Sequence, residues 1–140
     1  MSTYRARLDE IVQRDSRYPY EAYEFVFAAL NYTQQALGRA PSEDEAAAPA
    51  PQNHVSGREL LTGIRALAVR EFGLMARIVF RMWGIKRTDD FGEIVFNLVE
   101  EGLMSKTEQD ARDDFRDVFD LNQALEQDFR IELDKAEWMR

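Results

Sequence analysis

The chain has 140 residues, a formal net charge of −8 and no cysteine. At this length we expect one domain, residues 1–140, that buries about two-thirds of the surface its unfolded form exposes. The lack of cysteine excludes disulfides, thiolate nucleophiles, iron–sulfur centres and cysteine-ligated zinc.

The sequence contains no uninterrupted apolar run of about 18 residues, the length a membrane-spanning helix needs. Residues 1–17 mix arginine with acidic residues and lack the apolar stretch of a signal peptide. We therefore expect a cytoplasmic protein with no membrane partner.

Charge is distributed unevenly along the chain. Residues 58–87 carry seven basic and two acidic residues, whereas residues 88–137 carry five basic and sixteen acidic residues. Like charges at this density must be separated or neutralised when the chain compacts. Either the two segments neutralise each other, or each faces a partner.

A long aromatic helix is predicted from Pro19 to about Leu37, with Gly38 at its end. Two adjacent apolar stripes run along it, made of Ala22, Val26, Ala29, Thr33 and Leu37, and of Tyr20, Tyr23, Phe27 and Leu30. This apolar arc is wider than that of an ordinary surface helix. The helix is either central to the domain, or part of its aromatic face is covered by a second copy.

A flexible loop is predicted next, inside the single domain. Residues 39–53 are rich in alanine, proline and acids and lack any large apolar side chain. After it, Ser56 and Glu59 have the spacing of a capping box. They predict the start of a helix that carries an apolar stripe to Phe72 and stops at Gly73.

Two further helices are predicted in quick succession. The first is short, closes at Gly84, and turns inward a stripe of Met75, Ile78, Val79, Met82 and Trp83. The second is capped by Thr88 and ends at Gly102. Its predicted inward face consists of Phe91, Ile94, Val95, Leu98 and Val99.

The pattern changes after Gly102. Leu103–Met104 and the alternating segment Phe115–Phe119 predict two short strands around a polar loop, although a helix reaching back from Phe119 towards Glu108 is an alternative. Asp120 is placed to cap a last helix, and the weak periodicity of residues 126–140 leaves open whether they dock or fray. The predicted fold is mainly α (small α+β), with a winged-helix-like three-helix core, a short β-hairpin and the additional N-terminal aromatic helix.

No catalytic or cofactor motif is present. His54 is the only histidine and has no neighbouring cysteine or second histidine for a zinc site or a nucleophile–base pair. Phosphate-cradling, nucleophile-elbow and zinc-protease motifs are missing, and the acids at 110–120 lack the glycine of a calcium-binding loop. We expect no cofactor and no metal and favour a non-catalytic role. An enzyme pocket built from residues distant in sequence would leave no motif, so that class stays open.

A nucleic-acid partner is disfavoured by charge. The outward residues of the predicted third helix are Asp89, Asp90, Glu93, Asn97, Glu100 and Glu101. An acidic reading helix repels the phosphate backbone that it would have to approach. The basic segment, with Arg77, Arg81, Lys86 and Arg87, either pairs internally with these acids or holds an acidic or phosphate-bearing partner.

Three phrases together carry a resemblance: RYPYEAYEFVFAALNYTQ (17–34), HVSGRELLTGIRALAVREFG (54–73) and RTDDFGEIVFNLVEEGLMSKTEQDARDDF (87–115). Similar phrases occur in this order in a family of small uncharacterised bacterial proteins, which the chain resembles over about residues 11–125. The resemblance implies a bacterial protein and carries no activity, cofactor or site residue.

The sequence thus favours a non-catalytic protein-interaction or scaffold domain that self-associates. The candidate interaction surface comprises Tyr20, Tyr23, Phe27, Arg77, Arg81, Lys86 and Arg87. The alternative is a winged-helix nucleic-acid-binding regulator that uses the basic surface of residues 58–87.

Overall fold

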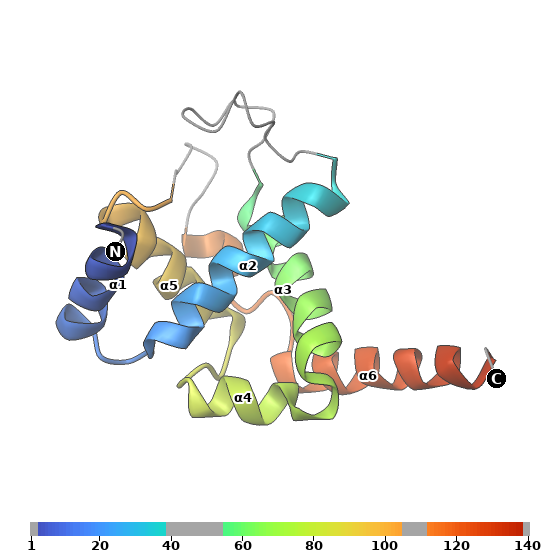
Figure 1. The fold of residues 1–140 in the computed structure, drawn as a ribbon. Helices are drawn as coiled ribbons and strands as arrows, with labels where there is room; N and C mark the ends of the chain where they lie inside the picture. The colour runs from blue at the N-terminus through green and yellow to red at the C-terminus, as the bar shows by residue number, and fades with distance from the viewer. Residues whose placement is uncertain (1–2, 39–54, 105–111, 139–140) are drawn as a thin grey trace.

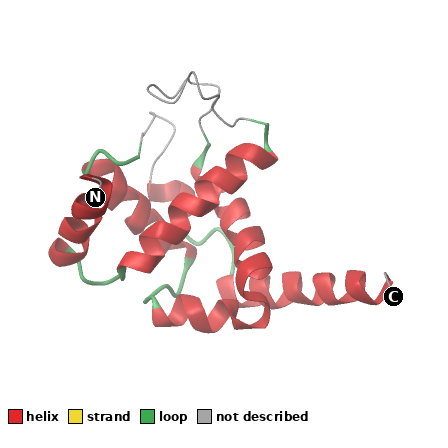
Figure 2. Ribbon diagram, viewed as in Figure 1, coloured by secondary structure: helices red, strands yellow, loops and turns green. Residues whose placement is uncertain are grey.

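The computed structural model describes residues 3–38, 55–104 and 112–138, and these residues form a mainly α structure (Figures 1 and 2). The α-helices are α1 (Thr3–Arg14), α2 (Tyr20–Ala36), α3 (Gly57–Phe72), α4 (Ala76–Met82), α5 (Thr88–Glu100) and α6 (Leu121–Trp138). Two 3₁₀ helices, η3 (Gly73–Met75) and η4 (Arg112–Phe115), join them. The predicted loop 39–53 lies outside the described residues.

Helix α2 is central, as one of the two sequence interpretations had it. It runs across the middle of the molecule between α1 and α3 (Figure 1) and buries Ala22, Tyr23, Phe25, Val26 and Ala29. Pro19 stands at its N-terminal end in an extended conformation, which suits a residue that has no N–H to donate. The wide apolar arc is therefore filled by this domain's own core.

Helix α3 packs closely on α2 and begins as the sequence predicted. The Ser56 hydroxyl accepts a bond from Glu59 N at 3.1 Å, and the Glu59 carboxylate accepts one from Ser56 N at 3.0 Å. This capping box satisfies two backbone N–H groups that a helix start leaves unpaired. The helix then buries Leu60, Leu61, Ile64, Leu67 and Ala68, and Gly73 ends it with a φ of 51°.

Helix α1 was not predicted. Leu8 and Ile11 are 0% exposed and hold it against the core, and Val12 packs beside them. These three positions have the i, i+3, i+4 spacing of a helix face. The signal is short because the other residues of α1 are mostly charged or polar.

Helix α4 is rotated relative to the prediction. It turns Ala76 and Phe80 inward, each 1% exposed, while Met75, Ile78 and Met82 of the predicted inward stripe face solvent. The Phe80 ring lies 5.6 Å from that of Phe25, 5.9 Å from Trp83 and 5.3 Å from Phe91. An aromatic ring surrounded by others buries more apolar area than a methionine in the same place, so Phe80 sets the rotation.

The predicted β-hairpin is wrong for those of its residues that the structure describes. Of its residues, 105–111 lie outside the described chain, and the described ones contain no strand: Arg112–Phe115 is the 3₁₀ helix η4 and a turn follows it. The Thr88 hydroxyl donates to Phe115 O at 2.7 Å and accepts from Val118 N at 3.1 Å. The winged-helix-like core, which needs that hairpin, is not confirmed.

Two glycines explain why this segment docks as a turn. The Phe115 ring lies against α3 and α5, where a Cβ added at Gly57 would come within 2.9 Å of its Cε2 atom. A Cβ added at Gly92 would come within 2.8 Å of the Phe115 Cβ. A side chain larger than hydrogen at either position would take up the space that this ring fills between the two helices.

The last helix begins where Asp120 predicted it. The Asp120 carboxylate accepts a hydrogen bond from Gln123 N at 2.9 Å, and Leu121, Ala124 and Leu125 are buried against the domain. Helix α6 continues to Trp138, and its C-terminal half extends away from the other helices (Figure 1). The periodicity of residues 126–140 had left this choice open.

We expect the core assignments to show in stability. Ile64 and Leu98 are both 0% exposed, so Ile64→Ala and Leu98→Ala should each lower the free energy of unfolding by about 2–5 kcal/mol. Urea unfolding followed by circular dichroism measures this. Leu37→Ala, at a side chain 43% exposed at the end of α2, is the control, and equal midpoints for all three variants would contradict the assignments.

The contact between α2 and α3 yields a second prediction. A Cβ at Gly63 would lie 1.7 Å from Thr33 Oγ1, which is held by a 2.6 Å bond to Ala29 O. Gly63→Ala should therefore destabilise the protein by about 1–3 kcal/mol through overpacking. Thr33→Ala in the same chain should recover part of that loss in a urea double-mutant cycle, whereas strict additivity would argue against the close approach.

Candidate interaction surfaces

The aromatic residues predicted as interaction contacts lie mostly inside the domain. Tyr23 is 0% exposed, and its hydroxyl accepts a 3.0 Å hydrogen bond from Asn97 Nδ2. Tyr20 and Phe27 are half-buried against the core, and the Arg5 guanidinium covers the Tyr20 ring at 5.5 Å. Tyr23 therefore has no surface to offer a partner, and Tyr20 and Phe27 offer only edges.

The predicted basic residues are exposed but occupy different elements. Arg77 and Arg81 lie on α4, whereas Lys86 and Arg87 lie in the turn before α5. Arg77 forms a 3.7 Å ion pair with Glu126 of α6. The structure thus keeps Arg77 and Arg81 together on one short helix and places Lys86 and Arg87 in a different segment.

The sequence led us to expect a free acidic outward face on α5, but several of these acids, in α5 and just after it, pair with arginines from residues 7–17. Glu101 pairs with Arg14 at 3.1 Å and also with Arg7, and Glu93 lies 3.5 Å from Arg17. Glu93 and Glu101 therefore find their counter-charges among arginines from before residue 18. The basic segment finds other partners, since Arg65 donates to Asp128 of α6 at 2.6 Å.

Asp90 is the acid most firmly turned inward. Its carboxylate accepts bonds from Tyr18 Oη at 2.6 Å and from the backbone N–H groups of Lys86 and Arg87 at 2.8 and 3.0 Å. It caps the start of α5 and fastens the chain before α2 to it. Burial, and then the bond to Asp90, raise the pKa of Tyr18 well above its usual range.

A second polar cluster joins α2, α5 and the turn after α1. The Asp15 carboxylate accepts bonds from Arg17 Nε at 2.9 Å and from Asn97 Nδ2 at 3.0 Å. The bonds from Arg17 are the main reason that the pKa of Asp15 lies well below its usual range, and burial raises the pKa of Tyr23. These shifted groups join helices and turns to one another.

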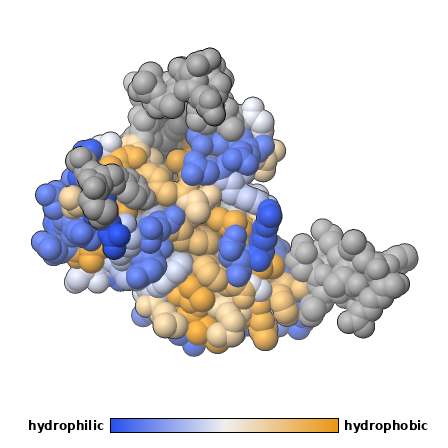
Figure 3. Space-filling view, in the orientation of Figure 1, coloured by the Kyte–Doolittle hydropathy of each residue, from blue (hydrophilic) through white to orange (hydrophobic). Residues whose placement is uncertain are grey.

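Among the described residues, four of the five exposed large hydrophobic side chains lie together on a face that we call the α4 face: Leu74, Met75, Ile78 and Met82. Their exposed fractions are 71%, 50%, 47% and 77%. Figure 3 shows hydrophobic surface at the edge of the molecule where Figure 1 places α4. A groove of about 270 Å³ continues this face towards Leu125 and Phe129 of α6.

The sequence held a signal for the α4 face that its interpretation missed. Ala76 and Phe80 form one i, i+4 pair and Ile78 and Met82 form another, so this short helix is apolar on two sides. Only one side can be buried when a helix lies on the edge of a domain. Larger aromatic area favours burial of the Phe80 side.

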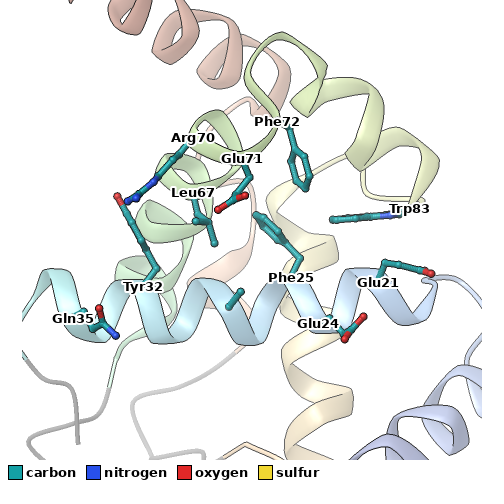
Figure 4. Close-up of a pocket in the computed structure, with 11 residues that line it drawn as sticks. Glu21, Glu24, Phe25, Tyr32, Gln35, Leu67, Arg70, Glu71, Phe72 and Trp83 are labelled. Carbon is teal, nitrogen blue, oxygen red and sulfur yellow. The ribbon is translucent and has the colours of Figure 1, made fainter.

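A second groove lies between α2 and the C-terminal part of α3 (Figure 4). We call it the aromatic groove. It has a volume of about 650 Å³ and contains the rings of Phe25, Phe72 and Trp83, with pairwise centroid distances of 5.6 to 5.8 Å. Its rim carries three exposed carboxylates, those of Glu21, Glu24 and Glu71.

Residues 3–38, 55–104 and 112–138 are the part of the chain that the structure describes. There, no helix is both long and apolar enough to cross a bilayer. The same residues include no group of three or more potential metal ligands, and His54 lies outside them.

Comparison with known proteins adds no relative to these observations. No protein-family model, no curated protein and no solved structure matches the chain. The resemblance to a bacterial family and the functional hypotheses therefore stay predictions. The features that bear on function are the α4 face and the aromatic groove.

The Asp15 cluster predicts how stability depends on pH. The folded-state pKa of Asp15 is depressed, so the unfolded chain binds the proton more tightly and the contribution of Asp15 is complete above its unfolded pKa of about 3.9. That contribution is lost as the pH falls below this value. Urea unfolding should show Asp15→Asn less stable than wild type at pH 7, with the gap narrowing below about pH 4. A constant gap would contradict the assignment.

Proposed function

We propose that the protein is a non-catalytic interaction domain that self-associates through the α4 face. The observation that carries this proposal is the exposure of four large apolar side chains side by side on η3 and α4. Apolar area removed from water stabilises a contact by about 25 cal/mol per Å². Contiguous apolar patches on soluble domains commonly mark sites of protein contact.

The fate of the shifted titratable groups supports a non-catalytic role. Catalytic acids and bases need a perturbed pKa together with access to a substrate. Asp15, Tyr18 and Tyr23 have perturbed pKa values, but each is engaged in bonds between helices. Their environment serves to join elements of the domain, and we place the function at the surface.

A nucleic-acid-binding regulator with a winged-helix core is the weaker alternative. Arg65 and Arg77 of the basic segment are engaged with Asp128 and Glu126 of α6, which reduces the charge they would offer a phosphate backbone. Glu93 in α5 and Glu101 just after it pair with arginines from residues 7–17, and an acidic helix still repels a phosphate backbone. A protein partner fits the exposed apolar side chains better.

The proposed function also has a cellular location. We place the domain in the bacterial cytoplasm, following the family resemblance. The domain is a helical scaffold whose core residues all come from one copy. We therefore expect substitutions on the α4 face to change self-association and substitutions in the core to change the free energy of unfolding.

Light scattering coupled to size-exclusion chromatography tests the proposal. The wild-type mass should rise from monomer to dimer with concentration, and Ile78→Ser and Met82→Ser should each raise the dissociation constant by about tenfold or more. Leu37→Ser is the matched control, because Leu37 is an exposed apolar residue at the end of α2, with 43% exposure. A wild type that stays monomeric at millimolar concentration, or unaffected α4 variants, would refute the proposal.

A further inference from the structure

The aromatic groove and the α4 face adjoin each other on the surface. Trp83 directly follows the last residue of α4 and is also part of the groove wall. Met82, the most exposed residue of the α4 face, is its sequence neighbour. Trp83 in the groove and Met82 on the α4 face thus bring the two surfaces next to each other along the chain.

These two parts have opposite chemical character. The groove combines the rings of Phe25, Phe72 and Trp83 with three rim carboxylates, against one guanidinium, Arg70, among the lining residues (Figure 4). The α4 face combines methionine and aliphatic side chains with the exposed guanidinium groups of Arg77 and Arg81. A cation and a thioether both make favourable contacts with aromatic rings.

We infer that the aromatic groove of one copy receives the α4 face of a second copy, with Arg81 at the acidic rim and Met82 on the aromatic rings. This inference rests on the proposed self-association and names the surface that α4 meets. Each copy carries both halves of the contact next to each other. A two-fold axis through the patch therefore makes both contacts at once and closes a dimer.

Each copy carries the two opposite charges that the contact needs, Arg81 on α4 and Glu24 in the lining of the groove. The chain carries a net charge of −8, so two copies repel each other unless opposite charges meet locally. Arg81 faces Glu24 of the other copy in the proposed dimer, and Arg81 of that copy faces Glu24 of the first. Stable complexes bury about 800 Å² per partner, which is a large area for a single groove to supply. A two-fold axis repeats the contact and so doubles the buried area.

A charge-reversal experiment tests this pairing with the full chain. Arg81→Glu alone and Glu24→Arg alone should each raise the dimer dissociation constant by about tenfold or more, since each places like charges together twice. Mixing the two single variants should restore a dimer, because both contacts of the mixed pair then join opposite charges. Arg81→Glu combined with Glu24→Arg in one chain should restore it too. Sedimentation velocity measures all four samples.

Matched controls separate local pairing from total charge. Arg58→Glu and Glu10→Arg change the net charge equally at exposed positions on α3 and α1, and they should leave the dissociation constant within about threefold of wild type. Thermal melts of every variant confirm folding. Equal weakening by Glu10→Arg and Glu24→Arg would overturn the proposed pairing.

The outcomes distinguish this inference from the proposed function. If Met82→Ser disrupts the dimer while Glu24→Arg does not, the α4 face self-associates but does not use the groove, and the inference falls alone. Failure of the mixed variants to restore the dimer also overturns it. Assemblies that grow beyond two copies would contradict the two-fold closure, and a strictly monomeric wild type would remove both proposals.

Discussion

The burial of Phe80 is the constraint on which both proposed surfaces depend. Its ring lies among those of Phe25, Trp83 and Phe91, at centroid distances of 5.3 to 5.9 Å, and it is 1% exposed. Residues two positions away on a helix lie about 160° around its axis. Burying Phe80 therefore turns Ile78 and Met82 to solvent and places Trp83 beside the groove between α2 and α3.

Electrostatic neutralisation follows a different route from the one the charge distribution suggested. The basic segment 58–87 and the acidic segment after it are neighbours in sequence, and mutual pairing was the simplest expectation. Instead, α1 supplies Arg7 and Arg14 to Glu101 of α5, and α6 supplies Asp128 to Arg65 of α3. Side chains of α1 and α6 thus supply the counter-charges for Glu101 and Arg65. Arg81 on α4 remains exposed.

The elements that could be predicted from sequence were those whose signals are local. The Ser56–Glu59 capping box and the apolar stripe that includes Ile64 specify α3 through contacts within a few residues, and both are confirmed. The helix start at Asp120 is of the same kind. The mainly α fold follows from such signals because each helix carries its own start, stripe or stop.

What could not be predicted depends on contacts between distant residues. The docking of Phe115 requires the absence of a Cβ at both Gly57 and Gly92, which no local pattern reveals. The alternating apolar residues of 115–119 therefore indicated a strand where the structure has a turn. The α4 rotation is similar, because two apolar sides competed for burial and the aromatic partners of Phe80 come from α2, α5 and the turn after α4.

Net charge limits the kind of self-contact that we propose for this domain. Repulsion between two copies of charge −8 acts over tens of ångströms, whereas ion pairs within a contact act over a few. At physiological ionic strength the Debye length is about 8 Å, so salt screens the long-range repulsion more than the partly desolvated pairs. A patch that joins basic and acidic halves around Trp83 therefore supports association where a single-sign patch would oppose it. The apolar groups of the α4 face supply the attraction that salt does not screen.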